Sequence, residues 1–227
     1  MNTYIKATEY CESVFDGTHD TPKPTEEGMP LVTSKHIMQG ELVLKDAYNI
    51  SLKDYTEINK RSKISQWDIL FSMIGTVGNT YIEKSNNINY AIKNIGVFSC
   101  KDEKKAKFLY YYLQSPYAKR FISSYLNGAV QKFLPLGKLR EFPILPYTDD
   151  KNNIVDLLSS IDEKIEINNK INIELENMAK TLYDYWFVQF DFPDENKRPY
   201  KSWFKKILKS INDFASSNLQ SGGLKYA

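Results

Sequence analysis

The 227-residue sequence has few cysteines and histidines and no long apolar run. Its two cysteines, Cys11 and Cys100, lie far apart without a CxxC partner, which argues against a disulfide framework and a zinc ribbon and is typical of a reducing compartment. No apolar run approaches the roughly 20 residues that a bilayer span needs, and the first residues lack the basic-then-apolar pattern of a signal peptide. We therefore expect a cytoplasmic protein with no membrane partner.

The usual catalytic motifs are also absent, including a glycine-rich phosphate loop, GxSxG, HExxH and the Asn-Pro-Pro-aromatic motif of amino-methyltransferases. The stretch PDENK at 193–197 superficially resembles a PD…ExK nuclease signature. In such nucleases, however, the Asp and the ExK pair come from separate strands. His19, His36 and Cys11 match no metal-ligand spacing. We predict no catalytic residue, no metal and no cofactor in this chain.

Acidic residues are missing from one long stretch, although the net charge of the chain is only +2. Between Asp149 and Glu195 there are twelve acids against four lysines, and Lys197 to Lys209 holds six bases and no acid. The acid-free stretch from Lys104 to Arg140 contains eight bases, namely Lys104, Lys105, Lys107, Lys119, Arg120, Lys132, Lys138 and Arg140. This sorting predicts one face for a polyanion and another part that avoids it. Solvated helix faces are the alternative.

The balance of 42% hydrophobic and 26% charged residues is that of an ordinary globular protein. Residues 1–147 contain short apolar segments broken by Gly, Asn and Pro, which indicates a mixed, strand-rich domain. Residues 104–126 interrupt it with helical spacing, and Pro116 is expected to start a second helix. We predict an α+β fold in three parts: this domain at 1–147, a long helix at 148–193, and a turn with a short helix at 194–227.

The long helix carries a repeating apolar seam whose positions alternate steps of three and four residues. Seven of its nine positions are apolar, which predicts a coiled coil of about four heptads. The seam consists of Ile154, Leu157, Ile161, Lys164, Asn168, Ile171, Leu175, Met178 and Leu182. Asn168 at a core position disfavours wrong registers, because an off-register pairing would bury its amide without a partner. The stripe needs a partner from this chain or another copy; a helix packed on its own domain is the alternative.

The last segment, KSWFKKILKSINDFASSNLQ, places its apolar residues on one side of a second, basic amphipathic helix. We expect this helix to pack on the first helix or on a symmetry mate. A membrane-surface role is a weaker interpretation, since nothing else in the chain points to lipid.

Polar and basic side chains of the expected loops suit DNA recognition. Lys and Arg neutralise phosphates, whereas Asn, Gln, Ser, Thr, His and some Arg read base edges. The candidate DNA-binding residues are Thr18, His19, Thr21, Lys23, Ser34, Lys35, His36, Thr76, Asn79, Lys119, Arg120, Gln131, Lys132 and Lys138. Gly75 and Gly78 bracket a turn that would allow close backbone approach to a ligand. Each residue taken alone is also compatible with plain turn chemistry.

Five sequence blocks resemble the specificity (S) subunits of type I restriction-modification systems. They are FDGTHDTPKPTEEGMPLVTSKHI, DILFSMIGTVGNTYI, FLYYYLQSP, GAVQKFLPLGKLREFPILP and IVDLLSSIDEKIEINNKINIELENMAKTLYDYWFVQFDFP. Their order is similar to that of one target-recognition domain followed by one conserved helix, and covers residues 1 to about 201. Members of the family usually carry two of each, so this chain departs from the pattern.

The resemblance implies that residues 1–147 recognise one half of a split DNA sequence and that the helix is a spacer and dock for methyltransferase subunits. A restriction subunit is a further possible partner, and the partners would supply the S-adenosylmethionine and ATP chemistry. Pairing of two copies through the helix would make the site an interrupted palindrome. At about 1.5 Å per residue the seam runs roughly 42 Å, or something like 12 base pairs at about 3.4 Å each.

Two other interpretations stay open. The chain could be an interaction module that dimerises or occupies methyltransferase subunits without productive DNA recognition. It could also be the detached recognition domain of a single-chain methyltransferase, which the missing catalytic half disfavours.

Overall fold

The computed structural model describes residues 4–38, 40–126, 132–184 and 209. The chain divides into two compact units, Met1–Ser160 and Ile161–Ala227. The first unit mixes helices and strands, and the long helix α6 (Asn152–Tyr183) begins in it. The predicted α+β class with a long helix is therefore confirmed. The short C-terminal helix predicted within 194–227 falls outside the described residues, apart from Lys209.

A four-stranded antiparallel sheet forms the centre of the first unit, with the strands in the order β2 (Ser13–Asp16), β10 (Ile95–Ser99), β7 (Asp68–Ser72) and β8 (Thr80–Ile82). Every residue of β7 and β10 is buried. Because successive strand residues point to opposite faces, Phe71 and Phe98 enter one core and Leu70 and Val97 enter another. The sheet is therefore covered on both faces.

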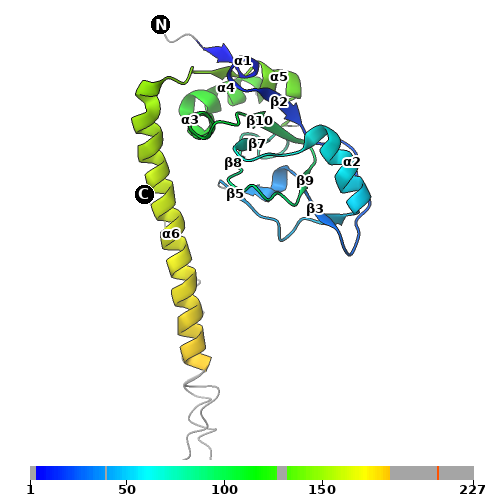
Figure 1. Ribbon diagram of the computed structural model, residues 1–227, viewed down its shortest axis with the longest axis vertical. Helices are drawn as coiled ribbons and strands as arrows, with labels where there is room; N and C mark the ends of the chain where they lie inside the picture. Colours follow the sequence, from blue (N-terminus) through cyan, green and yellow to red (C-terminus); the bar gives the residue numbers. More distant parts are fainter. Residues whose placement is uncertain (1–3, 39, 127–131, 185–208, 210–227) are drawn as a thin grey trace, which may run out of the picture. The chain divides into compact units, whose positions relative to one another are not determined.

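Helices cover one face of this sheet (Figure 1): α3 (Glu103–Gln114), α4 (Pro116–Leu126) and α5 (Leu136–Arg140). The rings of Phe71 and Phe98 pack edge to face at a centroid distance of 5.9 Å. Asp102 caps α3 by accepting a hydrogen bond from the backbone N–H of Lys105 at 2.8 Å. Pro116 is the first residue of α4, as predicted, where its missing N–H has no intrahelical partner to lose.

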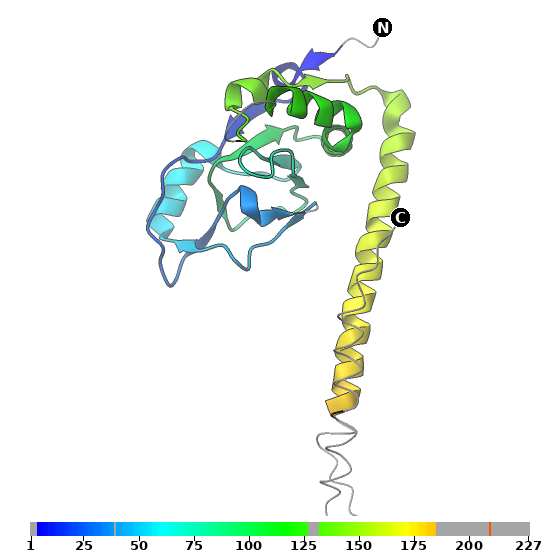
Figure 2. The ribbon, with the colours of Figure 1, turned by 180° about the vertical axis from the view of Figure 1, so that it is seen from behind.

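A second, smaller sheet lies on the other side and has the strand order β6 (Asn49–Ile50), β3 (Met29–Val32) and β9 (Ala91–Ile92). Strand β3 pairs antiparallel with β6 and parallel with β9. Helix α2 (Leu52–Ser62) runs along its outer side (Figure 2). Leu31, Ile50 and Ala91 are buried under this helix, with Tyr55 and Ile58 packed against them.

Short elements complete the first unit: β1 (Ile5–Lys6), α1 (Ala7–Tyr10), the 3-10 helix η1 (Ser34–His36), β4 (Ile37–Met38), β5 (Glu41–Leu42), β11 (Pro143–Ile144) and the 3-10 helix η2 (Asp149–Lys151). Strands β1 and β11 pair antiparallel. This pairing ties the beginning of the chain to the segment that leads into α6. Strands β4 and β5 form a separate antiparallel pair.

Helix α6 has two distinct faces. In the first unit, Val155 is buried and Ser159 accepts a hydrogen bond from the hydroxyl of Tyr111 at 3.4 Å. The apolar seam residues that precede Leu182 are instead between 46% and 61% exposed: Ile154, Leu157, Ile161, Ile171, Leu175 and Met178. Asn168 is exposed as well, and Leu182 lies in the last turn of the helix. Within the described ranges, no helix is both long and apolar enough to cross a bilayer.

Candidate nucleic-acid interface

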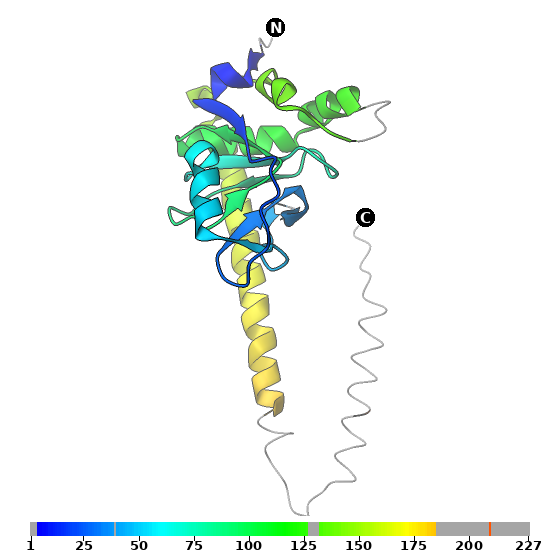
Figure 3. The ribbon, with the colours of Figure 1, turned by 90° about the vertical axis from the view of Figure 1, so that its right-hand side faces the viewer.

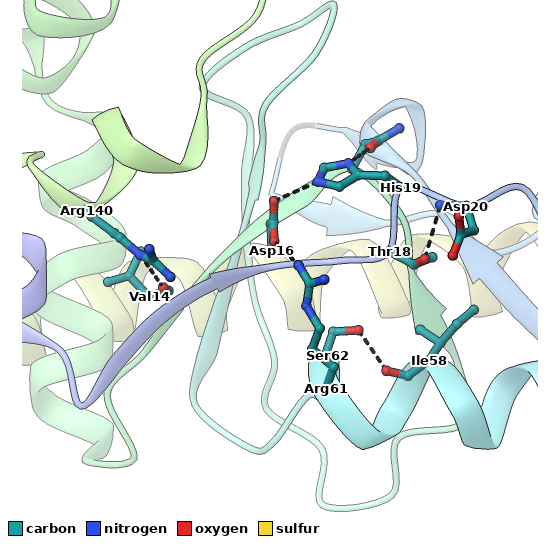
Figure 4. Close-up of polar contacts among 10 residues, drawn as sticks. Val14, Asp16, Thr18, His19, Asp20, Ile58, Arg61, Ser62 and Arg140 are labelled. Atoms are coloured by element: carbon teal, nitrogen blue, oxygen red, sulfur yellow. Dashed lines mark hydrogen bonds and ion pairs between the residues drawn. The ribbon is translucent and has the colours of Figure 1, made fainter.

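A buried carboxylate organises the loop that follows β2. Asp16, the last residue of that strand, accepts a hydrogen bond from Nη2 of Arg61 through Oδ1 at 3.1 Å (Figure 4). Its Oδ2 faces Nε2 of His19 at 3.2 Å. Arg61 comes from the last turn of α2 and its side chain is 72% exposed, while that of His19 is 59% exposed. One buried acid therefore holds two exposed side chains from different elements.

The turn between β9 and β10 joins the same loop. Nδ1 of His19 lies 2.7 Å from Oδ1 of Asn94, a residue in the left-handed region with a φ of 53°. The backbone N–H of Asn94 donates to the carbonyl of Thr18 at 3.1 Å. In addition, the ammonium of Lys93 donates to Oγ1 of Thr21. Short polar residues such as Asn tolerate the left-handed region, which lets this turn approach the loop closely.

Four predicted residues meet in this group, since the hydroxyl of Ser34 also donates to the carbonyl of Asn94 at 3.1 Å and so joins Thr18, His19 and Thr21. Sequence reasoning missed four further members, namely Asp16, Arg61, Lys93 and Asn94. Asp16 lies three residues before His19, but Arg61, Lys93 and Asn94 are 45 to 75 positions from their partners, so no local pattern could reveal those three. The only signal was Asn94 itself, a typical turn residue between two apolar segments.

The residues of η1 differ in their access to solvent. His36 is buried, and its Nδ1 accepts a hydrogen bond from the backbone N–H of Thr33 at 2.8 Å. Burial lowers the pKa of His36, because it disfavours the charged imidazolium. Ser34 is buried too, whereas Lys35 is exposed, as is Lys23 in the preceding loop. Burial does not favour the predicted DNA contacts of Ser34 and His36; the two lysines are accessible.

A second group of residues lies on and beside the loop between β7 and β8. Figure 3 shows the backbone of the first unit from this side. Thr76 is exposed in this loop, and Gly75 has a φ of 75°, which an L side chain rarely adopts. The backbone N–H of Gly75 donates to the carbonyl of Lys132 at 3.2 Å, so Lys132 lies beside the loop. Asn79 donates from its side chain to the carbonyl of Ile37 at 2.9 Å. That bond uses one of the two amide N–H donors of Asn79, and its side-chain oxygen and second N–H are the potential ligand contacts.

The predicted residues of α4 and α5 fall into two kinds. Lys119 and Arg120 are exposed on α4. Lys138 is paired with Glu141 at 2.9 Å and lies 5.8 Å from the ring centroid of Tyr125. Its hydrogen bond with Glu141 raises the pKa of Lys138 and engages its charge. Gln131 lies outside the described residues.

Two buried carboxylates accept hydrogen bonds within the fold. Glu83 accepts a hydrogen bond from the hydroxyl of Tyr90 at 2.7 Å, and Asp68 accepts one from the backbone N–H of Ser65 at 2.8 Å. Burial raises the pKa of Asp68. Cys11 and Cys100 are buried free thiols whose sulfur atoms lie 3.7 Å apart. Among the residues that the structure describes, no group of three or more His, Cys, Asp or Glu side chains is placed to hold a metal ion.

Comparison with known sequences identifies the family of the chain. A family model for the type I restriction modification DNA specificity domain matches residues 16–177. The chain is 26% identical over 196 residues to the type I restriction enzyme MjaIX specificity subunit of Methanocaldococcus jannaschii, covering 81% of this chain and 44% of that protein. It is 40% identical over 47 residues to the type I restriction enzyme HindI specificity subunit of Haemophilus influenzae, which is 21% of this chain and 10% of that protein.

Solved structures have the same fold. The S subunit of a type I restriction-modification system from M. genitalium superposes with a TM-score of 0.54 at 18% identity, over 81% of this chain and 44% of that one. A chain from a study of complex assembly and conformational transition of the type I R-M system gives a TM-score of 0.51 at 17% identity, over 79% of this chain and 43% of that one. At these identities the likeness concerns the fold alone.

The fold is that of the DNA specificity class, and the family match covers most of the first unit and most of α6. The chain belongs to the family of type I restriction modification DNA specificity domains. The resemblance found in the sequence is thereby confirmed. The chain spans less than half the length of the MjaIX subunit and of the two solved structures.

Proposed function

We propose that this chain is the non-catalytic DNA-recognition subunit of a type I restriction-modification complex and reads one half of an interrupted sequence. The proposal is carried by the convergence of polar and basic side chains from two loops and the end of α2 on a domain of the DNA specificity family. Basic side chains bind phosphates and short polar ones read base edges. Lys132 offers a basic side chain and Thr76 a short polar one, and the two residues lie on adjacent segments.

The distribution of charge supports a DNA partner for the first unit. The acid-free stretch from Lys104 to Arg140 contains all of α4 and α5 and nearly all of α3. Helix α6 carries an excess of acids, with Glu163 and Glu174 among its exposed residues. DNA is attracted to the first surface and repelled by the second, because its phosphates are negative at every step. The helix can then separate two recognition domains without wrapping onto DNA.

We further propose that two copies pair through the α6 seam. The exposed apolar side chains of the seam would be covered by the same seam of a second copy, and Asn168 would hold the register. Two copies would also supply two recognition domains, in line with relatives whose length is more than twice the matched region. A two-fold dimer presents the same reader twice, so the predicted site is an interrupted palindrome.

The catalytic steps would belong to partners. Specificity subunits of type I systems are non-catalytic, and catalysis lies in other subunits. We propose that α6 also docks the methyltransferase subunits, and that a restriction subunit joins where one is present. S-adenosylmethionine and ATP would then bind to those subunits, and this chain would need no cofactor. We place the assembly in the cytoplasm.

A second candidate function is an interaction module that dimerises or occupies methyltransferase subunits without productive DNA recognition. The long exposed stripe on α6 favours it, because an apolar seam binds a protein helix whether or not the first unit binds DNA. The basic stretch from Lys104 to Arg140 distinguishes the two functions, because DNA recognition needs its positive charge and helix pairing does not.

The test is a fluorescence-anisotropy titration of the full chain against a duplex of about 30 base pairs at several salt concentrations. DNA recognition predicts that the logarithm of the binding constant falls with the logarithm of salt at a slope of about −0.9 per phosphate contacted, for several contacts. Absence of salt-dependent binding, with helix pairing intact by light scattering, would reject DNA recognition and leave the interaction module.

A further inference from the structure

We propose that Arg61 contacts a DNA phosphate and that buried Asp16 is its positioning residue. This inference rests on the proposed DNA-binding function and adds a residue that lies outside the basic stretch of the chain. Arg61 belongs to α2, which precedes the basic stretch from Lys104 to Arg140 in the sequence. Only the fold brings Arg61 to the loop after β2. The proposal extends the DNA-binding surface to the C-terminal end of α2.

The geometry of the pair separates the anchoring and the binding parts of the guanidinium. One nitrogen, Nη2, is 3.1 Å from the carboxylate of Asp16, which is only 4% exposed. A guanidinium has five N–H donors in a fixed plane, so most of them remain for a ligand on a side chain that is 72% exposed. Oδ2 of the same carboxylate faces His19, so the two exposed groups are held at one edge.

A purely structural role accounts for only part of this arrangement. Arg61 offsets the charge of the buried Asp16 carboxylate, and a buried charge that loses its partner destabilises the fold. That role engages Nη2, and the other donors of the exposed guanidinium are not needed for it. Anchoring does matter for binding, since a free arginine side chain loses rotamer freedom when it is immobilised on a ligand. Asp16 removes part of that loss before DNA arrives.

The anchoring also selects a phosphate over a base. The major groove is about 8.5 Å deep, and a base-reading side chain must project freely into it. The end of the Arg61 side chain is instead held against β2 by Asp16 (Figure 4). A guanidinium lying along the protein surface meets the sugar-phosphate backbone first, and its planar fork matches phosphate oxygens. Thr76, exposed in its loop, suits base contact better.

The test compares Arg61→Ala with Lys60→Ala in the full chain. Lys60 is the matched control, because it is the neighbouring exposed cation of α2 and is likewise paired with an acid, Glu57, but has no link to Asp16. Each variant is titrated by fluorescence anisotropy against a random-sequence duplex of about 30 base pairs at several salt concentrations. Random DNA suffices, since a phosphate contact carries no sequence information.

We expect Arg61→Ala to weaken binding about tenfold and to reduce the salt slope by about one contact, while Lys60→Ala keeps the wild-type slope. Asp16→Ala should also weaken binding, although it raises the net charge by one; simple attraction predicts tighter binding instead. Thermal melts show whether Asp16→Ala and Arg61→Ala fold, since each removes one partner of a pair whose acid is buried. If either does not, Arg61→Ala combined with Asp16→Asn, which removes both charges, carries the test. Wild-type binding by Arg61→Ala, or equal losses in both α2 variants, overturns the inference. Absence of DNA binding by the wild type overturns the proposed function itself.

Discussion

The exposed seam of α6 leads to a quantitative prediction about assembly. We expect Leu175→Asp to weaken pairing of two copies and Ile161→Asp with Leu175→Asp to abolish it. Leu175 and Ile161 are 56% and 46% exposed, so each has about half of its side chain left to bury in a dimer. Full burial of such a side chain stabilises by about 1.5–3 kcal/mol, so half of it contributes about 1 kcal/mol.

The effect doubles because each substitution occurs in both copies. Leu175→Asp should cost about 2 kcal/mol, and the double variant about 4 kcal/mol, which is a roughly thousandfold rise in the dissociation constant. The desolvation of the new carboxylates acts in the same direction. Light scattering should report about twice the 26.4 kDa chain mass for the wild type and a single chain mass for the double variant.

Ile173→Asp is the matched control. Ile173 is 57% exposed and lies two residues before Leu175, which places it about 200° away around the helix and off the seam. Leu and Ile differ in helix propensity by less than about 0.5 kcal/mol, which is small beside the expected effect on pairing, so a dimer that pairs through the seam tolerates Ile173→Asp. A monomeric wild type, or equal effects of Ile173→Asp and Leu175→Asp, would refute seam pairing.

Two further predictions concern the first unit. Burial lowers the pKa of His36 below the ordinary value of 6.5, so below that pH the unfolded chain binds a proton more readily than the folded chain does. The free energy of unfolding should therefore be constant at higher pH and fall as the pH drops through 6.5. It should level off below the pKa of His36 in the folded chain. Urea unfolding of wild type and His36→Gln across pH 5 to 8 checks this, and an unchanged slope in the variant would contradict it. Gly17→Ala should lose about 1–3 kcal/mol of stability, because a Cβ at this position would lie 2.5 Å from the carbonyl oxygen of Ile92. Gly137→Ala is the control and should not destabilise, because no atom lies within 4 Å of a Cβ there. Equal urea midpoints for the two variants would contradict this prediction.

Periodic elements were predictable from the sequence. The seam of α6 and the pair of helices divided at Pro116 follow from three- and four-residue spacing, and both are present. The apolar segments DILFSMIG and IGVFSC contain β7 and β10. The pairing of these strands, and the parallel contact between β3 and β9, depends on contacts between residues far apart in the chain, which no local pattern encodes.

The candidate site was predictable only in part, for the same reason. Residue type and loop position led to Thr18, His19 and Thr76, which lie in loops as expected. They could not reveal that His36 is buried, because a three-residue 3-10 helix has too few positions to show which face is covered. Nor could they reveal Arg61, whose link to Asp16 joins the end of a helix to the end of a strand.

The most direct test of the central claim is to map the DNA sites methylated when the full chain is co-expressed with the methyltransferase subunits that are proposed to dock on it. A half-site reader that pairs through α6 predicts methylation at a single interrupted palindrome, lost in Ile161→Asp with Leu175→Asp and retained in Ile173→Asp. Methylation at a continuous or asymmetric sequence, or at the same palindrome when the seam carries the two charges, would contradict the claim.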